Sequence, residues 1–200
     1  MSYGHDGHRI SPRTLERLAT YLTCLIELDE EGVVSISSND MARIVGVDAQ
    51  QFRKDLSYFG EFGKPGVGYP VKGLRDSIAR ALRLDRQQDV VLVGAGNLGS
   101  ALVAYPAWGS YRFRIVAVFD CSRMKIGRLL WGLEVQDIRH LAARNDELKA
   151  RIGIMAVPPS AAQSVAEQLA DAGIRVMLNF APVVVHVAEP VVVRNVCFVE

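Results

Sequence analysis

The sequence has few of the residues that build disulfide frameworks or metal sites. Its three cysteines, Cys24, Cys121 and Cys197, are an odd number, lie far apart and have no metal-ligand spacing. Of the four histidines, His5 and His8 fall in a glycine-rich N-terminus, where a polar tail is a better interpretation than a metal site. This usage argues against disulfides and zinc and is typical of a reducing compartment. We therefore expect a cytoplasmic protein without a bound metal.

The sequence also lacks long apolar runs and a strong net charge. No run approaches the ~18 residues that cross a bilayer, and the N-terminus lacks the apolar core of a signal peptide, so no membrane association is expected. The net charge of +1 excludes neither nucleic acid nor small molecules, because a basic patch can exist within a balanced total. Half of the 200 residues are hydrophobic, which is enough for the cores of one large or two small domains.

Residues 1–85 are predicted to form a helix-turn-helix domain. Ser11-Pro12 is typical of a helix start, and a second, short helix ends at Gly46. Asp48 is the expected N-cap of a third helix over residues 49–59. Two short helices joined by a tight, glycine-containing turn are the helix-turn-helix arrangement.

The third predicted helix has a core face and polar faces. Phe52, Leu56 and Phe59 recur at helical spacing and are expected to face the core. The polar side chains are of the types that bind phosphates and base edges in a major groove. They are Gln50, Arg53, Lys54, Ser57 and Tyr58. DNA binding is the favoured interpretation, and a solvated helix followed by a flexible linker is the alternative.

A glycine-rich stretch over residues 60–71 follows this helix, with Lys64 near a predicted hairpin tip. A short hairpin after a recognition helix is the wing of a winged helix. A further helix over 74–84 is expected to close the domain, and residues 85–89 to link it to the next.

The second domain, residues 86–200, opens with a glycine motif in the context that dinucleotide binding requires. A β-branched run over 90–93 leads into Gly94-Ala95-Gly96-Asn97-Leu98-Gly99, which matches G-x-G-x-x-G, and a helix is predicted next. Gly94 permits a tight turn, Gly96 leaves room for a pyrophosphate, and Gly99 lets helix and strand pack closely. N–H groups at the helix start would face the phosphates. A glycine-rich turn that binds nothing is the alternative.

An acidic residue lies where a ribose-binding side chain is expected. Asp120 ends a strand predicted over 114–119, roughly 20 residues past the motif. A carboxylate there accepts hydrogen bonds from both ribose hydroxyls and repels a 2′-phosphate, which favours NAD over NADP. If the side chains of Arg123 and Lys125 reach the ribose, they weaken this preference for NAD. If they are only surface cations, the preference is unchanged.

Strands and helices alternate through the rest of this domain. This alternation predicts an α/β fold with a doubly wound parallel sheet of the Rossmann type. Ligands bind such sheets beyond the carboxyl ends of the strands, so the expected crevice includes Val157-Pro158 and residues 179–182. The later strands are predicted over 152–157, 174–178, 183–187 and 191–199.

The catalytic groups of a dehydrogenase are missing from the sequence. The dinucleotide fold uses all the residues that follow the first domain. His140 lies on a predicted polar helix and His186 in a late strand, and neither is paired with a carboxylate at a recognisable spacing. We therefore expect a regulator whose ligand shifts a conformational equilibrium, not an enzyme. A small NAD-dependent oxidoreductase with an unusual N-terminal domain is the alternative.

The sequence resembles the bacterial redox-sensing repressor family Rex. The resemblance is carried by residues 52–64, Gly66-Val67-Gly68-Tyr69, the glycine motif, residues 152–158 and residues 178–182, which together span nearly the whole chain. The first segment is long and unusual, so it is more specific than the glycine motif. The resemblance implies a homodimer that binds palindromic operator DNA when NAD⁺ prevails and releases it when NADH binds.

The resemblance also implies roles for individual residues. It places an interdomain switch at Arg17 and a tyrosine near the nicotinamide at Tyr105. The implied DNA contacts are Arg53, Lys54, Ser57 and Tyr58 on the recognition helix and Lys64, Gly66, Gly68 and Tyr69 in the wing. With the crevice residues, the expected NAD(H) site comprises Gly94, Ala95, Gly96, Asn97, Leu98, Gly99, Tyr105, Asp120, Lys125, Val157, Pro158, Asn179 and Phe180.

Two features depart from the family's pattern. The family continues past the last strand into a C-terminal helix that swaps between subunits, whereas this sequence ends at Glu200. The family also has an acidic residue shortly after an Asn-Val pair, and here Asn195-Val196 precedes Cys197-Phe198. If that acid pairs with Arg17, the ion pair is absent. A nucleotide-binding paralogue that no longer reads redox state is therefore a third interpretation.

Overall fold

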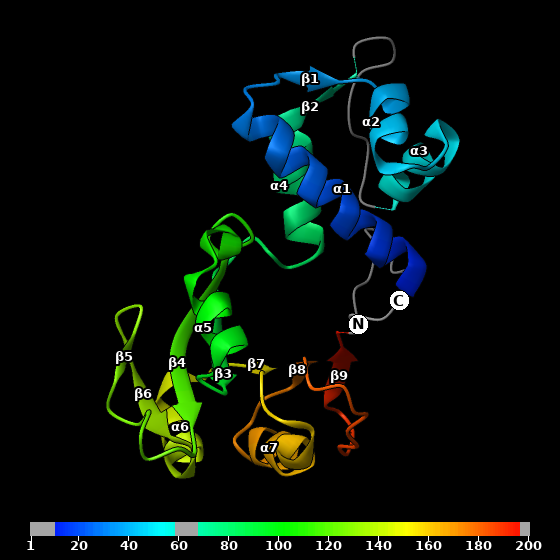
Figure 1. Ribbon diagram of the computed structural model, residues 1–200. Coiled ribbons are helices and arrows are strands. Elements are labelled where there is room, and N and C mark those ends of the chain that lie inside the picture. The colour runs from blue at the N-terminus through cyan, green and yellow to red at the C-terminus, as the bar shows by residue number, and fades with distance from the viewer. Residues whose placement is uncertain (1–10, 59–67, 197–200) are drawn as a thin grey trace. The chain divides into compact units, whose positions relative to one another are not determined.

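The computed structural model describes residues 11–58 and 68–196, and the chain divides into two compact units, Met1–Arg86 and Gln87–Glu200 (Figure 1). Among the described residues, no helix has the length and apolar character needed to span a membrane. The first unit contains α1 (Pro12–Glu30), β1 (Ser35–Ile36), α2 (Ser38–Val45), α3 (Ala49–Ser57), β2 (Tyr69–Pro70) and α4 (Val71–Ala81), and β1 pairs antiparallel with β2.

The helix boundaries of the first unit follow local capping chemistry. Ser11 caps α1 and Asp48 caps α3, each by accepting a hydrogen bond from the backbone N–H three residues later. Gly46 ends α2 in the left-handed conformation, with a φ of 74°. These three predictions are confirmed. The last helix, α4, begins at Val71, three residues earlier than predicted, and Val71 is fully buried in the core.

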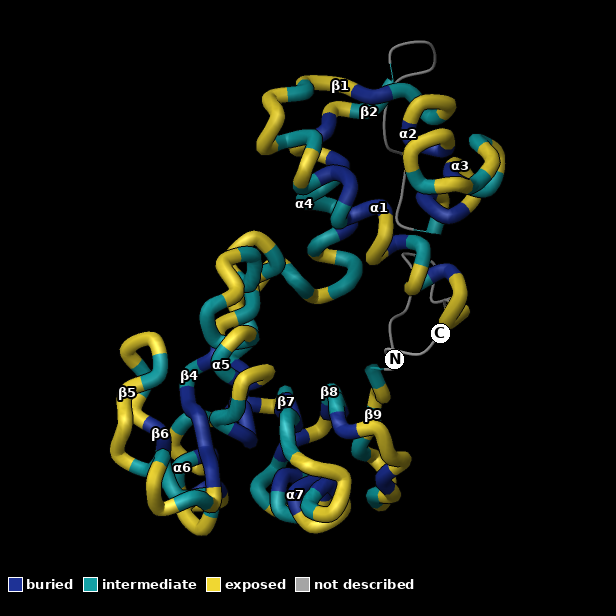
Figure 2. The backbone as a smooth tube through the Cα atoms, viewed as in Figure 1, coloured by how far each residue is buried: buried dark blue, intermediate teal, exposed yellow. Residues whose placement is uncertain are grey.

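Aromatic rings from three elements meet in the core of the first unit. The ring of Phe52 on α3 lies edge-on to Tyr21 of α1, with centroids 5.0 Å apart, and edge-on to Tyr69 of β2, at 5.5 Å. Buried residues recur along α1 and α3 in Figure 2. Phe52 and Leu56 are buried as predicted, and Phe59 lies outside the described residues.

The second unit is built on one sheet. Its described strands lie in the order β5-β6-β4-β3-β7-β8-β9, and every pair except β5–β6 is parallel. Without the edge strand β5, this is the strand order of the doubly wound dinucleotide fold, so the predicted fold class is confirmed. The strands are β3 (Gln88–Val93), β4 (Phe113–Asp120), β5 (Leu129–Leu130), β6 (Leu133–Asp137), β7 (Ile152–Met155), β8 (Val176–Asn179) and β9 (Val192–Asn195). The helices are α5 (Asn97–Ala104), η1 (Pro106–Trp108), η2 (Ile138–His140), α6 (Leu141–Leu148) and α7 (Pro159–Asp171).

The central strand β3 is buried on both faces of the sheet. Val90 and Leu92 pack in the cluster that includes Leu102 of α5, whereas Val91 and Val93 pack in the cluster that includes the buried face of α7. Burial on both faces explains why the sequence of β3 is a continuous apolar run without alternation. This packing fixes the end of β3, from which the glycine loop begins.

The predicted strand over residues 183–187 is wrong. These residues form a bend and irregular structure, because the N–H of Val183 bonds the carbonyl oxygen of Ala181 and the Asn179 side chain binds the carbonyl oxygen of Val183. Of the three valines at 183–185, only Val185 is buried. The last strand covers Val192–Asn195, and residues 197–200 lie outside the described part of the chain.

Candidate functional site

The glycine loop joins β3 to α5, and two of its glycines are required by close backbone contacts. A Cβ on Gly94, whose φ is +106°, would lie 2.2 Å from the carbonyl oxygen of Ala156. A Cβ on Gly99 would lie 1.8 Å from the carbonyl oxygen of Gly94. Gly96 differs, because a Cβ there meets no atom of the described residues within 4 Å. The fold therefore requires Gly94 and Gly99, whereas the space beside Gly96 is available to a ligand.

The N-terminus of α5 has the features of an anion site. Gly96 is its N-cap, and within the described residues no side chain caps its first turn. Backbone N–H groups of a first helical turn have no partners within the helix, and the helix dipole places partial positive charge there. Asn97 and Leu98 are exposed at this end. A pyrophosphate group therefore fits beside this turn.

Asp120, at the end of β4, lies beside the glycine loop. Its buried carboxylate accepts hydrogen bonds from the backbone N–H groups of Ala95 and Ser122, both at 2.8 Å, and from the ammonium group of Lys125, at 2.9 Å. Burial acts to raise the pKa of Asp120, but these three donors outweigh it, and the pKa is lowered. The carboxylate is thus held ionised at the loop, with Lys125 beside it.

Three further residues of the predicted crevice lie near the loop. The side chain of Val157 is 3.2 Å from the position of a Cβ on Gly94, and Pro158 follows as the N-cap of α7. Phe180 packs in the same hydrophobic cluster as Ala95. The structure therefore brings the ends of β3, β4, β7 and β8 together at one edge of the sheet.

Asn179, a predicted nucleotide-binding residue, uses its side chain to bind groups of the protein itself. Asn179 is fully buried. Its amide nitrogen donates to the carbonyl oxygen of Val183 and to the side chain of Asn195, and its amide oxygen accepts a hydrogen bond from the N–H of Ala181. Because the amide binds protein groups at both ends, it shapes the segment after β8 and holds β9.

Tyr105 is not brought to the glycine loop within this unit. It is the C-cap of α5 and lies about 13 Å from Gly96 at the helical rise of 1.5 Å per residue. Its half-exposed ring lies edge-on to Trp108, with centroids 5.8 Å apart.

Helix α3 separates exposed polar residues from buried ones. The buried residues are Phe52, Asp55 and Leu56. The exposed ones are Gln50, Arg53, Lys54 and Ser57. Their spacing of three, one and three residues places these four on a single face of the helix. Arg53 also donates a hydrogen bond to the hydroxyl of Ser38 at 2.8 Å, so α2 helps to orient it.

The remaining predicted DNA contacts lie at or beyond the end of α3. Tyr58 is half-buried at the C-cap. A Cβ on Gly68 would lie 2.7 Å from the carbonyl oxygen of Ile36, and the ring of Tyr69 packs on Phe52, so both residues also have structural roles. Lys64 and Gly66 lie outside the described residues.

Known proteins share both halves of this arrangement. A family model described as "Putative DNA-binding protein N-terminus" matches residues 9–57, and one described as "CoA binding domain" matches residues 85–183. The chain is 46% identical over 190 residues to the redox-sensing transcriptional repressor Rex of Carboxydothermus hydrogenoformans, across 95% of this chain and 91% of that protein. It is 46% identical over 186 residues to the redox-sensing transcriptional repressor Rex 1 of Thermotoga maritima, across 92% and 89%. The chain belongs to the Rex family.

Solved structures agree with this assignment to Rex. The crystal structure of RSP, a Rex-family repressor, matches with a TM-score of 0.85 and 33% identity, across 95% of this chain and 88% of that one. RSP in complex with beta-NAD⁺ and operator DNA matches with a TM-score of 0.86 and 34% identity, across 94% and 87%. RSP in complex with beta-NADH matches with a TM-score of 0.85 and 32% identity, across 95% of this chain and 89% of that one.

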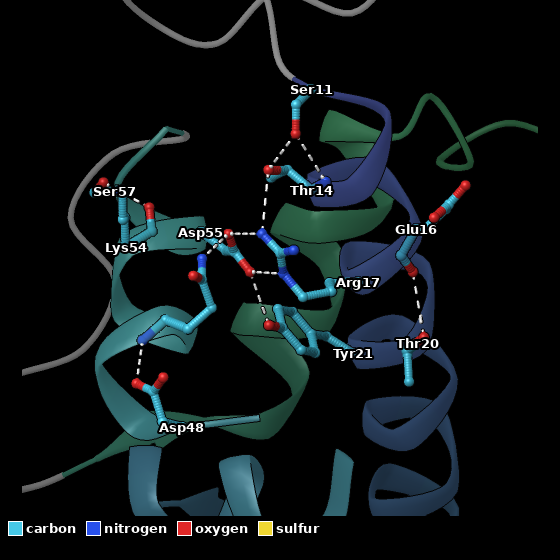
Figure 3. A network of polar contacts seen from close by, with 11 residues as sticks. Ser11, Thr14, Glu16, Arg17, Thr20, Tyr21, Asp48, Lys54, Asp55 and Ser57 are labelled. Carbon is cyan, nitrogen blue, oxygen red and sulfur yellow. Dashed lines mark hydrogen bonds and ion pairs between the residues drawn. The ribbon is translucent and has the colours of Figure 1, made fainter. Parts of the chain in front are cut away.

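One residue of this Rex chain was missed by sequence reasoning. Asp55 is fully buried on the core side of α3 and binds Arg17 through two hydrogen bonds of 2.6 Å (Figure 3). Arg17 therefore has an acidic partner within its own unit. The sequence contained a signal, because Asp55 falls between Phe52 and Leu56 on the apolar face of the helix.

The lowered pKa of Asp55 predicts an acid-dependent loss of stability. Burial acts to raise this pKa, but hydrogen bonds from Arg17, Tyr21 and Gln51 outweigh it. A carboxyl group with a lowered folded-state pKa contributes stability that is complete above its unfolded pKa of about 3.9 and is lost as the pH falls through the folded value. In urea denaturation followed by circular dichroism, we expect this contribution to be complete at pH 7 and to decline below about pH 4. Asp55→Asn is expected to flatten the decline, and an unchanged pH profile would contradict this assignment.

Proposed function

We propose that this Rex-family chain is a transcriptional repressor that binds operator DNA through α3 and the wing and releases it when NADH binds at the glycine loop. The observation that supports this most directly is the combination in one chain of two features. One is the exposed polar face of α3, and the other is a glycine loop with space beside Gly96. RSP, its relative, is described with beta-NAD⁺ and operator DNA and with beta-NADH.

The side chains that contact DNA differ in their chemistry. Arg53 and Lys54 are cations that bind phosphates, and Gln50 and Ser57 are donors and acceptors for base edges. Tyr58, Lys64, Gly66, Gly68 and Tyr69 complete the interface at the end of the helix and in the wing. A palindromic operator has two equivalent half-sites, which fits two copies of this chain related by a two-fold axis.

Different residues of the glycine loop and the crevice bind different parts of the nucleotide. The segment Gly94–Gly99 receives the pyrophosphate at the start of α5, and Asp120 binds the ribose hydroxyls, exchanging its bond with Lys125 for them. The crevice is lined by Val157, Pro158 and Phe180. Asn179 is buried and holds the segment after β8 in place. The assignment of Tyr105 to the nicotinamide rests on the family resemblance alone.

The nucleotide acts as a regulatory ligand and not as a substrate. The bound nicotinamide supplies the redox signal, and the chain responds because the two redox forms bind its conformations with different affinities. We infer a regulator and not an enzyme, working in the cytoplasm where bacterial DNA is found.

The test is binding to a labelled palindromic operator of the Rex type at one fixed salt concentration, with excess NAD⁺ and then excess NADH. We expect tight binding with NAD⁺ and a loss of at least about tenfold with NADH, equivalent to about 1.4 kcal/mol of coupling. Equal binding in both conditions would indicate a paralogue that does not read redox state. No binding in either, with steady turnover of NADH on a carbonyl substrate, would indicate an oxidoreductase.

A further inference from the structure

Four donor groups converge on one buried carboxylate between α1 and α3. Each oxygen of Asp55 accepts two hydrogen bonds: Oδ2 from Arg17 Nε and the Tyr21 hydroxyl, and Oδ1 from Arg17 Nη2 and Gln51 Nε2, all at 2.6–2.8 Å. Arg17 and Tyr21 are one turn apart on α1 and point toward Asp55 (Figure 3). Gln51 and Asp55 are one turn apart on α3. The cluster therefore ties one turn of each helix to the other.

This cluster adds directional polar contacts to the apolar and aromatic packing of α3. Phe52 and Leu56 hold α3 by apolar burial, which is non-directional and tolerates small rotations and slides. A bidentate arginine–carboxylate pair requires both parallel bonds to be aligned. Rotation of α3 about its axis would stretch at least one of the two bonds from Arg17. The cluster thus sets the rotation of the helix, and with it the direction of the face that carries Arg53 and Lys54.

Stability alone does not account for a buried ion pair at this position. An apolar pair of similar volume is often as stable as a buried ion pair, because desolvation offsets the attraction of the charges. Asp55 is fully buried, whereas the side chain of Arg17 is 28% exposed. The carboxylate bears the larger desolvation and makes all four bonds, so it is the centre of the cluster.

We propose that Asp55 is the positioning residue of the recognition helix: held by Arg17, Tyr21 and Gln51, it sets the orientation in which α3 presents its polar face to operator DNA. It touches no DNA itself. This inference rests on the proposed function, because it concerns the same helix and the same DNA.

The test compares Asp55→Asn with a matched control in the same unit. Arg75 of α4 and Asp29 of α1 form an ion pair. Asp29→Asn breaks this ion pair and removes no contact of α3. Affinities are measured for operator DNA and for non-specific DNA of the same length, at one salt concentration, on the full chain. A misdirected helix loses base contacts and keeps the cations that bind phosphates, so Asp55→Asn is expected to weaken operator binding at least about tenfold and non-specific binding less than about twofold. Asp29→Asn is expected to change neither.

The ratio of the two affinities separates positioning from folding. A purely structural defect lowers the active fraction and weakens both DNAs equally, so an unchanged ratio for Asp55→Asn would overturn the proposal. If that variant does not fold, Tyr21→Phe removes one donor and keeps the ring against Phe52; it is expected to lower the ratio by about threefold, the usual size of one hydrogen bond's effect. A wild-type ratio in a folded Tyr21→Phe would also count against the proposal.

Failure of the proposed function gives a different result. In that case the wild-type chain does not bind operator DNA in any nucleotide state. The positioning role is then judged by amide hydrogen exchange, which Asp55→Asn is expected to accelerate over α3 and leave unchanged over α4. Unchanged exchange over α3 would overturn it.

Discussion

Replacement of Gly96 by alanine is expected to abolish NADH binding and to leave the second unit folded. A Cβ at this position meets no atom of the described chain within 4 Å, and the backbone φ of −87° suits any residue. The added methyl group instead occupies the space in which the pyrophosphate approaches the backbone. We expect the affinity for NADH to fall at least about 100-fold, or about 2.7 kcal/mol, in a fluorescence titration.

Two other glycines serve as controls for this experiment. Gly109→Ala adds the same methyl group where the φ is −62° and a Cβ also meets no described atom within 4 Å, so NADH binding is expected to match the wild type. Gly99→Ala forces a Cβ to 1.8 Å from the carbonyl oxygen of Gly94 and is expected to destabilise the unit by more than about 3 kcal/mol. Wild-type affinity in Gly96→Ala would show that the pyrophosphate is not bound at this loop.

Local chemistry explains what the sequence predicts well. The caps at Ser11 and Asp48 and the turn at Gly94 depend on residues only a few positions apart, so their spacing carries the information. The doubly wound parallel sheet follows because alternating apolar strands and helices have few ways to cover both faces of a sheet. The contacts of Asp120 with the loop also agree with a motif spacing of about 20 residues.

The features that the sequence did not predict depend on contacts between residues far apart in the chain, or on local patterns that are compatible with more than one structure. Arg17 and Asp55 are 38 residues apart, and nothing in the neighbourhood of either shows that the other neutralises it. Valines 183–185 have the composition of a strand, but the side chain of Asn179 holds the carbonyl oxygen of Val183 in a bend. Asn179 is the last residue of β8, and the sequence around it does not show that its amide binds Val183, Ala181 and Asn195.

Charge reversal at Lys54 is expected to remove operator binding without affecting the fold or the nucleotide site. Lys54 is exposed on the polar face of α3, where a substitution changes stability by less than about 0.5 kcal/mol. A glutamate there replaces attraction to a phosphate by repulsion and prevents the release of one counterion. In Lys54→Glu, we expect operator affinity to fall about 100-fold and the slope of log K against log salt to become shallower by about one.

The matched control is Arg80→Glu, which makes the same change in net charge at an exposed position on α4. If net charge alone governs DNA binding, the two variants weaken it equally, because the net charge of the chain is the same in both. If α3 lies against the phosphates, Lys54→Glu weakens binding at least about tenfold more than Arg80→Glu, since the electrostatic gain requires direct neutralisation of phosphates. NADH titration should give the wild-type affinity in both variants, because the glycine loop and Asp120 belong to the second unit. Equal losses of operator binding would refute the assignment of α3 as the recognition helix.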